Sequence, residues 1–278
     1  MLSSARSPRV TAARRLTKRS FREQDQRFLA EGPQSVAEAL AEPDAVVEVF
    51  CSTDLAGRAA TLADAAREQG LPVTPVSREV MTALAQTVTP QGILAVCRFR
   101  DVPLATALSG HPVLVPLLAA VRDPGNAGTV LRAADAAGAD AVVFADASVD
   151  PYNAKCVRAS AGSLFHLPFV AGVPAAETVA AAKAAGLTVL AADAGPGAES
   201  LDDLDDHGAL AGPTAWLFGN EAWGLPDDLR ALADRVVAVP IHGRAESLNL
   251  ATAAAVCLYA SARAQRRKGG VLRAAAGD

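Results

Sequence analysis

From residue 112 onward, short apolar runs alternate strictly with alanine-rich amphipathic segments. The first apolar run is VLVPLLAAV, and the later runs are almost as continuous. Strands of this kind are buried on both faces, and repeated βα units built from them are typical of a parallel sheet covered by helices. Ligands of such sheets bind outside the carboxyl ends of the strands. The alternation therefore predicts an α/β domain over residues 112–278 with its site at that edge.

The residues before this domain predict a smaller α/β unit. Residues 1–20 are rich in Arg, Ser and Ala without apolar periodicity, which predicts a basic flexible arm. Residues 21–99 follow as a separate domain, with predicted strands at 46–52 and 93–99. The proline-containing stretch 100–111 is the expected linker.

The net charge of −4 hides an uneven distribution. Residues 1–30 contain eight Lys or Arg and two acidic residues. Residues 263–278 contain five Lys or Arg and one acidic residue. The body of the chain is therefore acidic. Basic ends on an acidic body suit a nucleic-acid partner, because phosphate contacts need only a local cluster of cations, but solubilising tails have the same pattern. Charge alone leaves both interpretations open.

Cysteine and histidine spacing predicts neither disulfides nor a metal site. The four cysteines form no C-x-x-C pair, and the four histidines show no ligand spacing. We therefore expect buried thiols in a reducing compartment and no bound metal. The apolar run 113–121 is shorter than the roughly 20 residues that cross a bilayer, and the sequence after Arg14 and Arg15 is not an export signal. The expected location is the cytoplasm, without membrane contact.

Three common α/β sites are missing from the sequence. A G-x-G-x-x-G loop does not follow the first strand of the domain, and neither a G-x-x-x-x-G-K-[ST] loop nor a G-x-S-x-G elbow occurs. A nicotinamide-dependent oxidoreductase, a P-loop NTPase and an α/β-hydrolase are therefore disfavoured.

Three polar segments each follow a predicted strand, and the first of them is VRDPGNAGTVLR. Asn126 is expected to cap the helix that starts here, because its side-chain oxygen can accept a backbone N–H bond. Arg132 lies one turn beyond Gly128, which brings a guanidinium close to a helix N-terminus, and both features favour a phosphate group. By itself, this segment is better explained as an ordinary capped helix with a solvated arginine.

The second and third segments are WLFGNEAWGLP and VPIHGRAESLNL. Glu221 stands beside tight backbone turns, where a carboxylate can bind the N–H groups of another loop. Ser247 is expected to cap the long final helix, and that structural role alone could explain it. Val239 and Leu248 offer apolar walls to a flat ring.

In this order, the three segments resemble the signature motifs of the SpoU (TrmH) family of RNA ribose 2′-O-methyltransferases, which belongs to the SPOUT class. The family motif N-x-G-x-x-x-R matches Asn126, Gly128 and Arg132. The family motif G-N-E followed by G-L matches the run from Gly219, and the S-L-N motif matches the run from Ser247.

The resemblance covers residues 112–265. RASAGSLFHLPF, which starts at Arg158, is similar to a further stretch of the family. One departure is Ala222, which stands where the family has glycine and bears on the conformation of that loop. RFLAEGPQSVAEAL also looks like the family's N-terminal substrate-binding domain, which resembles RNA-binding ribosomal proteins.

The resemblance implies a trefoil-knotted methyltransferase domain with a parallel sheet over residues 112–278, beside the smaller N-terminal α/β RNA-binding domain. It also implies S-adenosylmethionine as the cofactor and a homodimer as the assembly. The partner is RNA; the separate N-terminal domain favours large-subunit rRNA, and tRNA stays possible.

The resemblance also assigns roles to single residues. Those implied in catalysis and in ordering the loops are Arg132, Asn126, Glu221, Ser247 and Asn249. Those implied in cofactor binding are Gly219, Asn220, Val239, Ile241 and Leu248. Those expected to contact RNA are Arg158, Arg14, Arg15, Lys18 and Arg19. Because a guanidinium stays protonated at neutral pH, Arg132 is expected to hold a phosphate and stabilise the developing alkoxide rather than act as the sole base.

One alternative from another class stays open. A non-catalytic RNA-binding or ribosome-assembly factor could keep the fold without the activity, although the intact motif residues argue against it. Calorimetry with S-adenosylmethionine separates these two functions.

Overall fold

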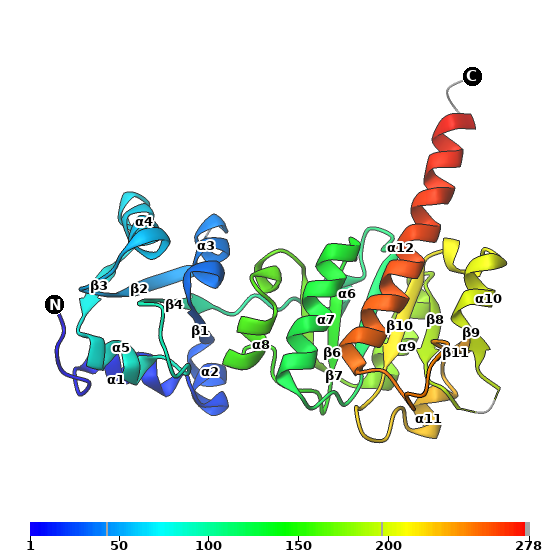
Figure 1. The fold of residues 1–278 in the computed structure, drawn as a ribbon, viewed down its shortest axis with the longest axis horizontal. Helices are drawn as coiled ribbons and strands as arrows, with labels where there is room; N and C mark the ends of the chain where they lie inside the picture. The colour runs from blue at the N-terminus through cyan, green and yellow to red at the C-terminus, as the bar shows by residue number, and fades with distance from the viewer. Residues whose placement is uncertain (43, 196, 276–278) are drawn as a thin grey trace. The chain divides into compact units, whose positions relative to one another are not determined.

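The computed structural model describes residues 1–42, 44–195 and 197–275, with side chains as far as residue 267. The chain divides into two compact units, which are drawn in Figure 1. Unit 1 comprises Met1–Arg100 and Asp150–His166, and unit 2 comprises Asp101–Val149 and Leu167–Asp278. Residues 276–278 of the predicted C-terminal domain lie outside the described residues.

Unit 1 is built on a four-stranded mixed sheet in the order β1-β4-β2-β3. The strands are β1 (Arg27–Glu31), β2 (Val46–Ser52), β3 (Val73–Val76) and β4 (Ile93–Arg98). β4 runs antiparallel to β1 and β2, whereas β2 and β3 are parallel. The predicted strands at 46–52 and 93–99 are confirmed to within one residue.

Helices cover both faces of this sheet. They are α1 (Pro8–Arg15), α2 (Arg19–Asp25), α3 (Pro33–Ala41), α4 (Gly57–Glu68), α5 (Arg78–Leu84), α8 (Ala154–Ala159) and the 3-10 turn η1 (Ser163–Phe165). α3 and α4 pack together on one face, and α1 and α5 pack together on the other (Figure 1).

Residues 1–20 fold differently from the predicted flexible arm. They form α1 and the start of α2, and Ser7 caps α1 by accepting the N–H of Val10. Val10, Ala13 and Leu16 are buried in a core that they share with α5 and the sheet. This narrow apolar stripe is interrupted in the sequence by arginines, and it therefore shows little periodicity.

Residues 150–166 interrupt unit 2 in the sequence but fold into unit 1. The ring of Tyr152 stacks on Phe99 with 3.8 Å between the ring centroids. Asp150 forms an ion pair with Arg22, and both side chains are almost fully buried. The alternating pattern placed this segment in the C-terminal domain, because periodicity does not reveal partners that lie more than 50 residues away.

Unit 2 is built on a seven-stranded sheet in the order β7-β6-β5-β10-β8-β11-β9. The strands are β5 (Leu114–Leu118), β6 (Val142–Ala145), β7 (Phe169–Val173), β8 (Thr188–Ala192), β9 (Glu199–Ser200), β10 (Thr214–Phe218) and β11 (Arg235–Ala238). The strand pairs in the described part of this sheet are all parallel, which confirms the predicted sheet type. β10 lies between β5 and β8, so the carboxyl ends of these three strands meet at one edge.

The helices of unit 2 cover both faces of this sheet. They are α6 (Leu104–Ala107), α7 (Pro124–Ala137), α9 (Ala175–Ala184), α10 (Leu201–Asp206), η2 (Ala209–Ala211), α11 (Asp227–Arg230) and α12 (Leu250–Ala275). α7 and α12 pack against each other (Figure 1), while α9 contributes to the core on the other face. α6 occupies the predicted linker 100–111, because Ala107 and Leu108 are buried in the same core as α9.

Two further observations concern the chain as a whole. All four cysteine side chains are buried, as predicted. Within residues 1–42, 44–195 and 197–275, none of the helices combines the length and the apolar character that a membrane span requires.

Candidate functional site

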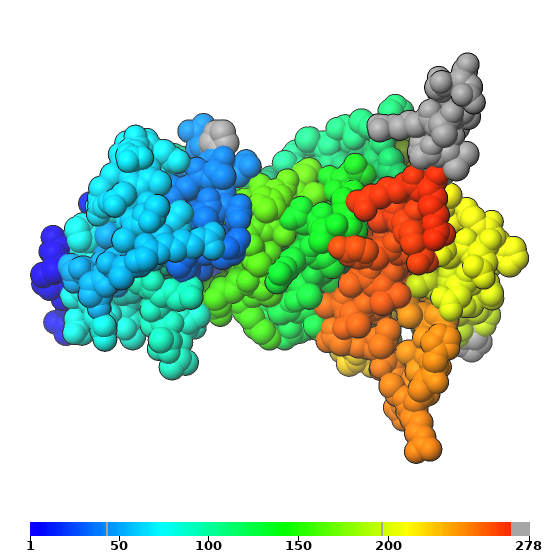
Figure 2. All heavy atoms as spheres, turned by 45° about the horizontal axis from the view of Figure 1, so that its top comes forward, coloured from blue at the N-terminus to red at the C-terminus, as the bar shows by residue number. Residues whose placement is uncertain are grey.

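A cavity of about 240 Å³ opens at the carboxyl edge of the unit 2 sheet. It is bounded by residues that follow β8, β10 and β11 and by the start of α12. The cavity is lined by all five residues implied in cofactor binding, which are Gly219, Asn220, Val239, Ile241 and Leu248. Glu221 and Ser247 also line it. Residues 241–249, which join β11 to α12, are exposed and project from unit 2 as the orange segment in Figure 2.

The chain leaves β10 in a tight turn between Gly219 and Gly224. The N–H of Asn220 donates to the carbonyl of Gly224 over 2.9 Å, and the N–H of Gly224 donates back over 3.0 Å. A Cβ atom on Gly219 would lie 2.4 Å from the backbone of Gly224, so only glycine fits there. Gly224 adopts a left-handed φ of +70°, whereas Ala222 does not. Alanine is therefore accommodated where the family has glycine.

The Asn220 side chain joins this turn to the end of β5. Its Nδ2 donates to the carbonyl of Ala120 over 2.8 Å, and its Oδ1 accepts the N–H of Ala222 over 2.8 Å. Ala120 has a φ of +57°, a conformation that residues with a Cβ seldom adopt. Asn220 thus binds a strained backbone position directly beside the cavity.

Glu221 binds the loop between β5 and α7. Its Oε2 accepts the backbone N–H of Arg122 over 3.2 Å, and its Oε1 accepts the N–H of Asp123 over 3.1 Å. Oε1 also accepts from Asn126 Nδ2 over 3.2 Å. Partial burial raises the pKa of this carboxyl, but the N–H donors outweigh it and hold the pKa below its ordinary value. The sequence-based expectation that Glu221 binds another loop is met.

Asn126 and Asn249 extend this contact to the third segment. Asn126 Oδ1 accepts from Asn249 Nδ2 over 3.0 Å. One short polar chain, Glu221–Asn126–Asn249, therefore connects the three sequence motifs. Its members come from the turn after β10, the first turn of α7 and the residue before α12.

Both predicted helix caps need correction. α7 is capped by Asp123, whose Oδ1 accepts the N–H of Asn126 over 2.8 Å. α12 begins at Leu250, where Asn249 Oδ1 accepts the N–H of Ala251 over 2.9 Å, so Ser247 lies before the helix. In each case a residue a few positions away makes the capping bond, so Asn126 instead bonds Glu221 and Asn249, and Ser247 lines the cavity.

The structure does not bring every predicted site residue to this cavity. Arg132 is an exposed residue of α7 and does not line it. Arg158 belongs to unit 1, where its Nη1 lies 3.4 Å from Glu31 Oε2 and its side chain is 32% exposed. The other residues expected to contact RNA also belong to unit 1 and are exposed: Arg14, Arg15, Lys18 and Arg19.

Sequence reasoning missed two carboxylates in the cavity, Asp193 and Glu246. Asp193 directly follows β8 and accepts the N–H of Gly195 over 3.1 Å, while Arg230 lies 3.8 Å away. Its place after an apolar strand, at the edge where ligands bind, was the available signal. Three carboxylates thus line the cavity, and Lys and Arg are absent from its described lining. This charge favours a cationic ligand.

Comparison with known proteins assigns the class. The sequence model of the SpoU rRNA Methylase family matches residues 114–259, and that of the MRM3-like substrate binding domain matches residues 7–95. The first match spans more than half of the chain and includes all three motifs. The chain therefore belongs to the SpoU rRNA methylase family.

Individual relatives resemble the chain over nearly its full length. The 23S rRNA (guanosine(2553)-2′-O)-methyltransferase RlmP of Bacillus subtilis is 36% identical over 259 residues, which cover 93% of this chain and 97% of that protein. The structure of the AdoMet-bound rRNA methyltransferase of Sinorhizobium meliloti matches with a TM-score of 0.81 at 30% identity, and the match covers 94% of this chain and 97% of that chain. The structure of the SpoU methyltransferase AviRb of Streptomyces viridochromogenes, in complex with the cofactor AdoMet, matches with a TM-score of 0.79 at 28% identity. This match covers 94% of this chain and 100% of that chain.

We expect Glu221→Gln to lower the free energy of unfolding of unit 2 by about 1 kcal/mol at pH 7, because the new amide cannot accept every N–H of the loop. Since the folded-state pKa is lowered, the contribution of the carboxylate is present above its ordinary pKa and is lost as the pH falls through the folded value. The difference in the free energy of unfolding between the variant and the wild type should therefore shrink below about pH 4.

Urea unfolding followed by tryptophan fluorescence measures this difference, because both tryptophans of the chain, Trp216 and Trp223, lie in unit 2. Glu246→Gln is the matched control, as Glu246 lines the same cavity; we expect it to change stability by less than about 0.5 kcal/mol. Equal effects of the two variants would contradict the proposed role of Glu221.

Proposed function

We propose that this protein transfers a methyl group from S-adenosylmethionine to a ribose 2′-hydroxyl of 23S rRNA. The observation that carries the proposal is the polar chain Glu221–Asn126–Asn249, which joins the three family motifs beside one cavity. The names of the relatives RlmP and the Sinorhizobium meliloti enzyme support rRNA over tRNA as the substrate.

The residues that line the cavity suit S-adenosylmethionine in polarity and charge. Val239, Ile241 and Leu248 provide apolar walls suited to a flat adenine ring, and ligand sites commonly combine such walls with a few polar groups. Asp193 and Glu246 add negative charge toward a cofactor that carries a sulfonium and an ammonium group. The bound cofactor supplies an electrophilic methyl group whose leaving group is a neutral thioether, so the protein has no need to protonate it.

The protein must then align the ribose hydroxyl and favour its deprotonated form. We assign Arg132 to the phosphate next to the reacting ribose and to the charge that develops on its oxygen. Glu221 fixes the loop that leads into α7, and the bond between Asn126 and Asn249 joins the first turn of α7 to the start of α12. The proton acceptor is then the RNA phosphate or water.

We also propose the assembly and the roles of the two units. Unit 2 is the catalytic domain, its chain is threaded as a trefoil knot, and unit 1 binds RNA through Arg14, Arg15, Lys18, Arg19 and Arg158. The protein acts as a homodimer in the cytoplasm. Exposed Val256 and Tyr259 on α12 support the dimer, because they line an open groove of about 770 Å³ on unit 2.

The direct test incubates the purified protein with S-adenosylmethionine and 23S rRNA, 16S rRNA or tRNA, and identifies methylated nucleosides by mass spectrometry. The proposal expects one 2′-O-methyl nucleoside in 23S rRNA. Failure to bind S-adenosylmethionine in calorimetry, together with retained rRNA binding, would instead identify a non-catalytic RNA-binding factor.

Arg132→Ala should lower the methylation rate by about two to four orders of magnitude, the range for loss of an acid–base or electrostatic group. The affinity for S-adenosylmethionine should stay within about two-fold, because Arg132 does not line the cavity. Single-turnover assays and calorimetry measure the two quantities. Arg132→Lys keeps the charge without the planar fork and should retain intermediate activity, and full turnover by Arg132→Ala would refute the assignment.

Tyr259→Glu should convert the proposed dimer into a monomer, because it places a charge in the apolar part of the groove. Light scattering after gel filtration measures the mass. Val88→Glu is the control, since Val88 is a fully exposed apolar residue of unit 1. A wild-type monomer, or a dimer that tolerates Tyr259→Glu, would contradict the proposed interface.

A further inference from the structure

Five exposed cations of unit 1 come from two segments that lie far apart in the sequence. Arg14 and Arg15 end α1, and Lys18 and Arg19 begin α2. Lys155 lies in the first turn of α8, more than 130 residues later. The family match for the substrate-binding domain ends at residue 95 and does not include α8.

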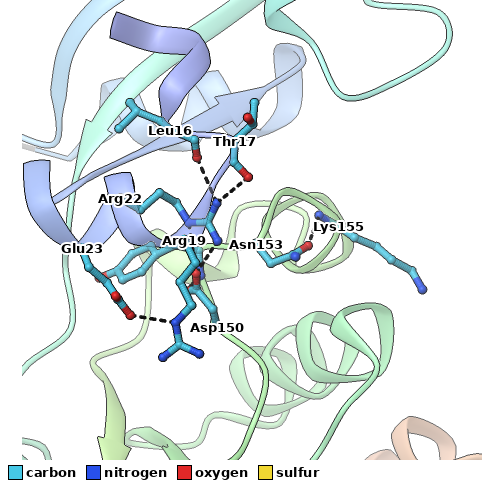
Figure 3. Close-up of polar contacts among 9 residues, drawn as sticks. Leu16, Thr17, Arg19, Arg22, Glu23, Asp150, Asn153 and Lys155 are labelled. Atoms are coloured by element: carbon cyan, nitrogen blue, oxygen red, sulfur yellow. Dashed lines mark hydrogen bonds and ion pairs between the residues drawn. The ribbon is translucent and has the colours of Figure 1, made fainter.

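A buried arginine joins these two segments. Arg22 is 4% exposed, and its Nη1 donates to the carbonyl of Leu16 over 2.9 Å and to that of Thr17 over 3.0 Å. Its Nε donates to Asp150 Oδ2 over 3.0 Å, and its Nη2 contacts the same oxygen. One guanidinium therefore holds the turn between α1 and α2 against the segment that leads into α8, as Figure 3 shows.

The contact continues from Asp150 into α8. Asp150 Oδ1 accepts the N–H of Tyr152 over 2.8 Å, and Asn153 Oδ1 caps the helix by accepting the N–H of Lys155 over 2.9 Å. The side chain of Lys155 extends from α8 away from the Arg22–Asp150 pair, and the side chain of Arg19 leaves α2 in a different direction, toward Glu23 (Figure 3). Arg19 also pairs with the exposed Glu23 over 2.7 Å.

The remaining cations lie on the same turn. The guanidinium of Arg15 lies 4.0 Å from the centre of the Phe21 ring, which fixes its direction. Lys18 directly follows the two residues whose carbonyls Arg22 binds, and Arg14 lies two residues before them. Cations that are already ordered lose less conformational entropy when they bind phosphate groups.

We propose that the α1–α2 turn and the start of α8 form one cationic surface that binds the phosphate backbone of RNA, with the Arg22–Asp150 pair as its positioning element. We call it the composite cationic surface; it consists of Arg14, Arg15, Lys18, Arg19 and Lys155. The inference rests on the proposed function in taking rRNA as the partner.

RNA fits this surface better than a lipid bilayer does. Membrane-surface helices combine cations with exposed large apolar side chains that enter the lipid. In the described parts of α1, α2 and α8, large apolar side chains are not among the exposed ones. Phosphate contacts, in contrast, need only cations at the surface.

The first experiment measures how the affinity for 23S rRNA depends on salt in the full-length protein. Each phosphate contact contributes about 0.7 to 0.9 to the slope of log K against log salt, so Arg19→Gln with Lys155→Gln should reduce the slope by roughly 1.5. The matched control is Arg58→Gln with Arg67→Gln, which removes two exposed cations from α4 on the other face of the sheet.

An unchanged salt slope in the Arg19/Lys155 double variant would overturn the proposed role of the composite cationic surface. An equal reduction of the slope in the control variant would overturn it as well. Binding of the wild type to vesicles of phosphatidylserine, lost in the same double variant, would also overturn the choice of RNA. Deleting residues 1–20 is a poor substitute, because Val10, Ala13 and Leu16 belong to the core of unit 1.

The second experiment tests Arg22 as a positioning residue with a double-mutant cycle. If the Arg22–Asp150 pair positions both segments of the composite cationic surface, the effect of Lys155→Gln on the salt slope should depend on Arg22. In the Arg22→Gln background, Lys155→Gln should then change the slope by less than half of its effect in the wild type. Additive effects would overturn the positioning role. Asp150→Asn, which keeps the shape of the side chain, provides the same cycle if circular dichroism shows that Arg22→Gln does not fold.

The outcomes separate this inference from the proposed function. A protein that shows the expected salt slopes but transfers no methyl group to 23S rRNA refutes the proposed function alone. A protein that methylates 23S rRNA but keeps its slope in the Arg19/Lys155 double variant refutes the composite cationic surface alone.

Discussion

The arrangement of the site depends on the carboxylate of Glu221. It accepts two backbone N–H groups and the Asn126 amide from a loop about 95 residues earlier in the chain. Without these bonds, the loop after β5 and the turn after β10 would be joined mainly through Asn220. The lowered pKa of Glu221 reflects the same contacts, since N–H donors stabilise the charged form.

The parallel sheet makes this contact possible. β10 lies between β5 and β8, so loops that are distant in the sequence leave the sheet at one edge. The residues after β8, β10 and β11 then line one cavity that carries three carboxylates. Apolar walls together with negative charge suit a cofactor that combines a flat ring with a net positive charge.

Much of this could be predicted from the sequence, because strand burial and motif order are local properties. The parallel sheet follows from the apolar runs, and the resemblance to the SpoU family implied five of the cavity-lining residues, from Gly219 to Leu248. Helix caps were predicted less well, since Asp123 and Asn249 compete with neighbours that could make the same bond. The position of residues 150–166 could not be predicted, because it depends on partners such as Arg22 that are far away in the chain.

Hydrogen exchange of the amides of Arg122 and Asp123 tests the central claim most directly. If Glu221 holds this loop, both amides should be protected in the wild type and exchange at least about ten-fold faster in Glu221→Ala. Amides in the middle of α7 should keep their protection in both proteins. Equal exchange of Arg122 and Asp123 in wild type and variant would contradict the account, because the loop would then be held by other contacts.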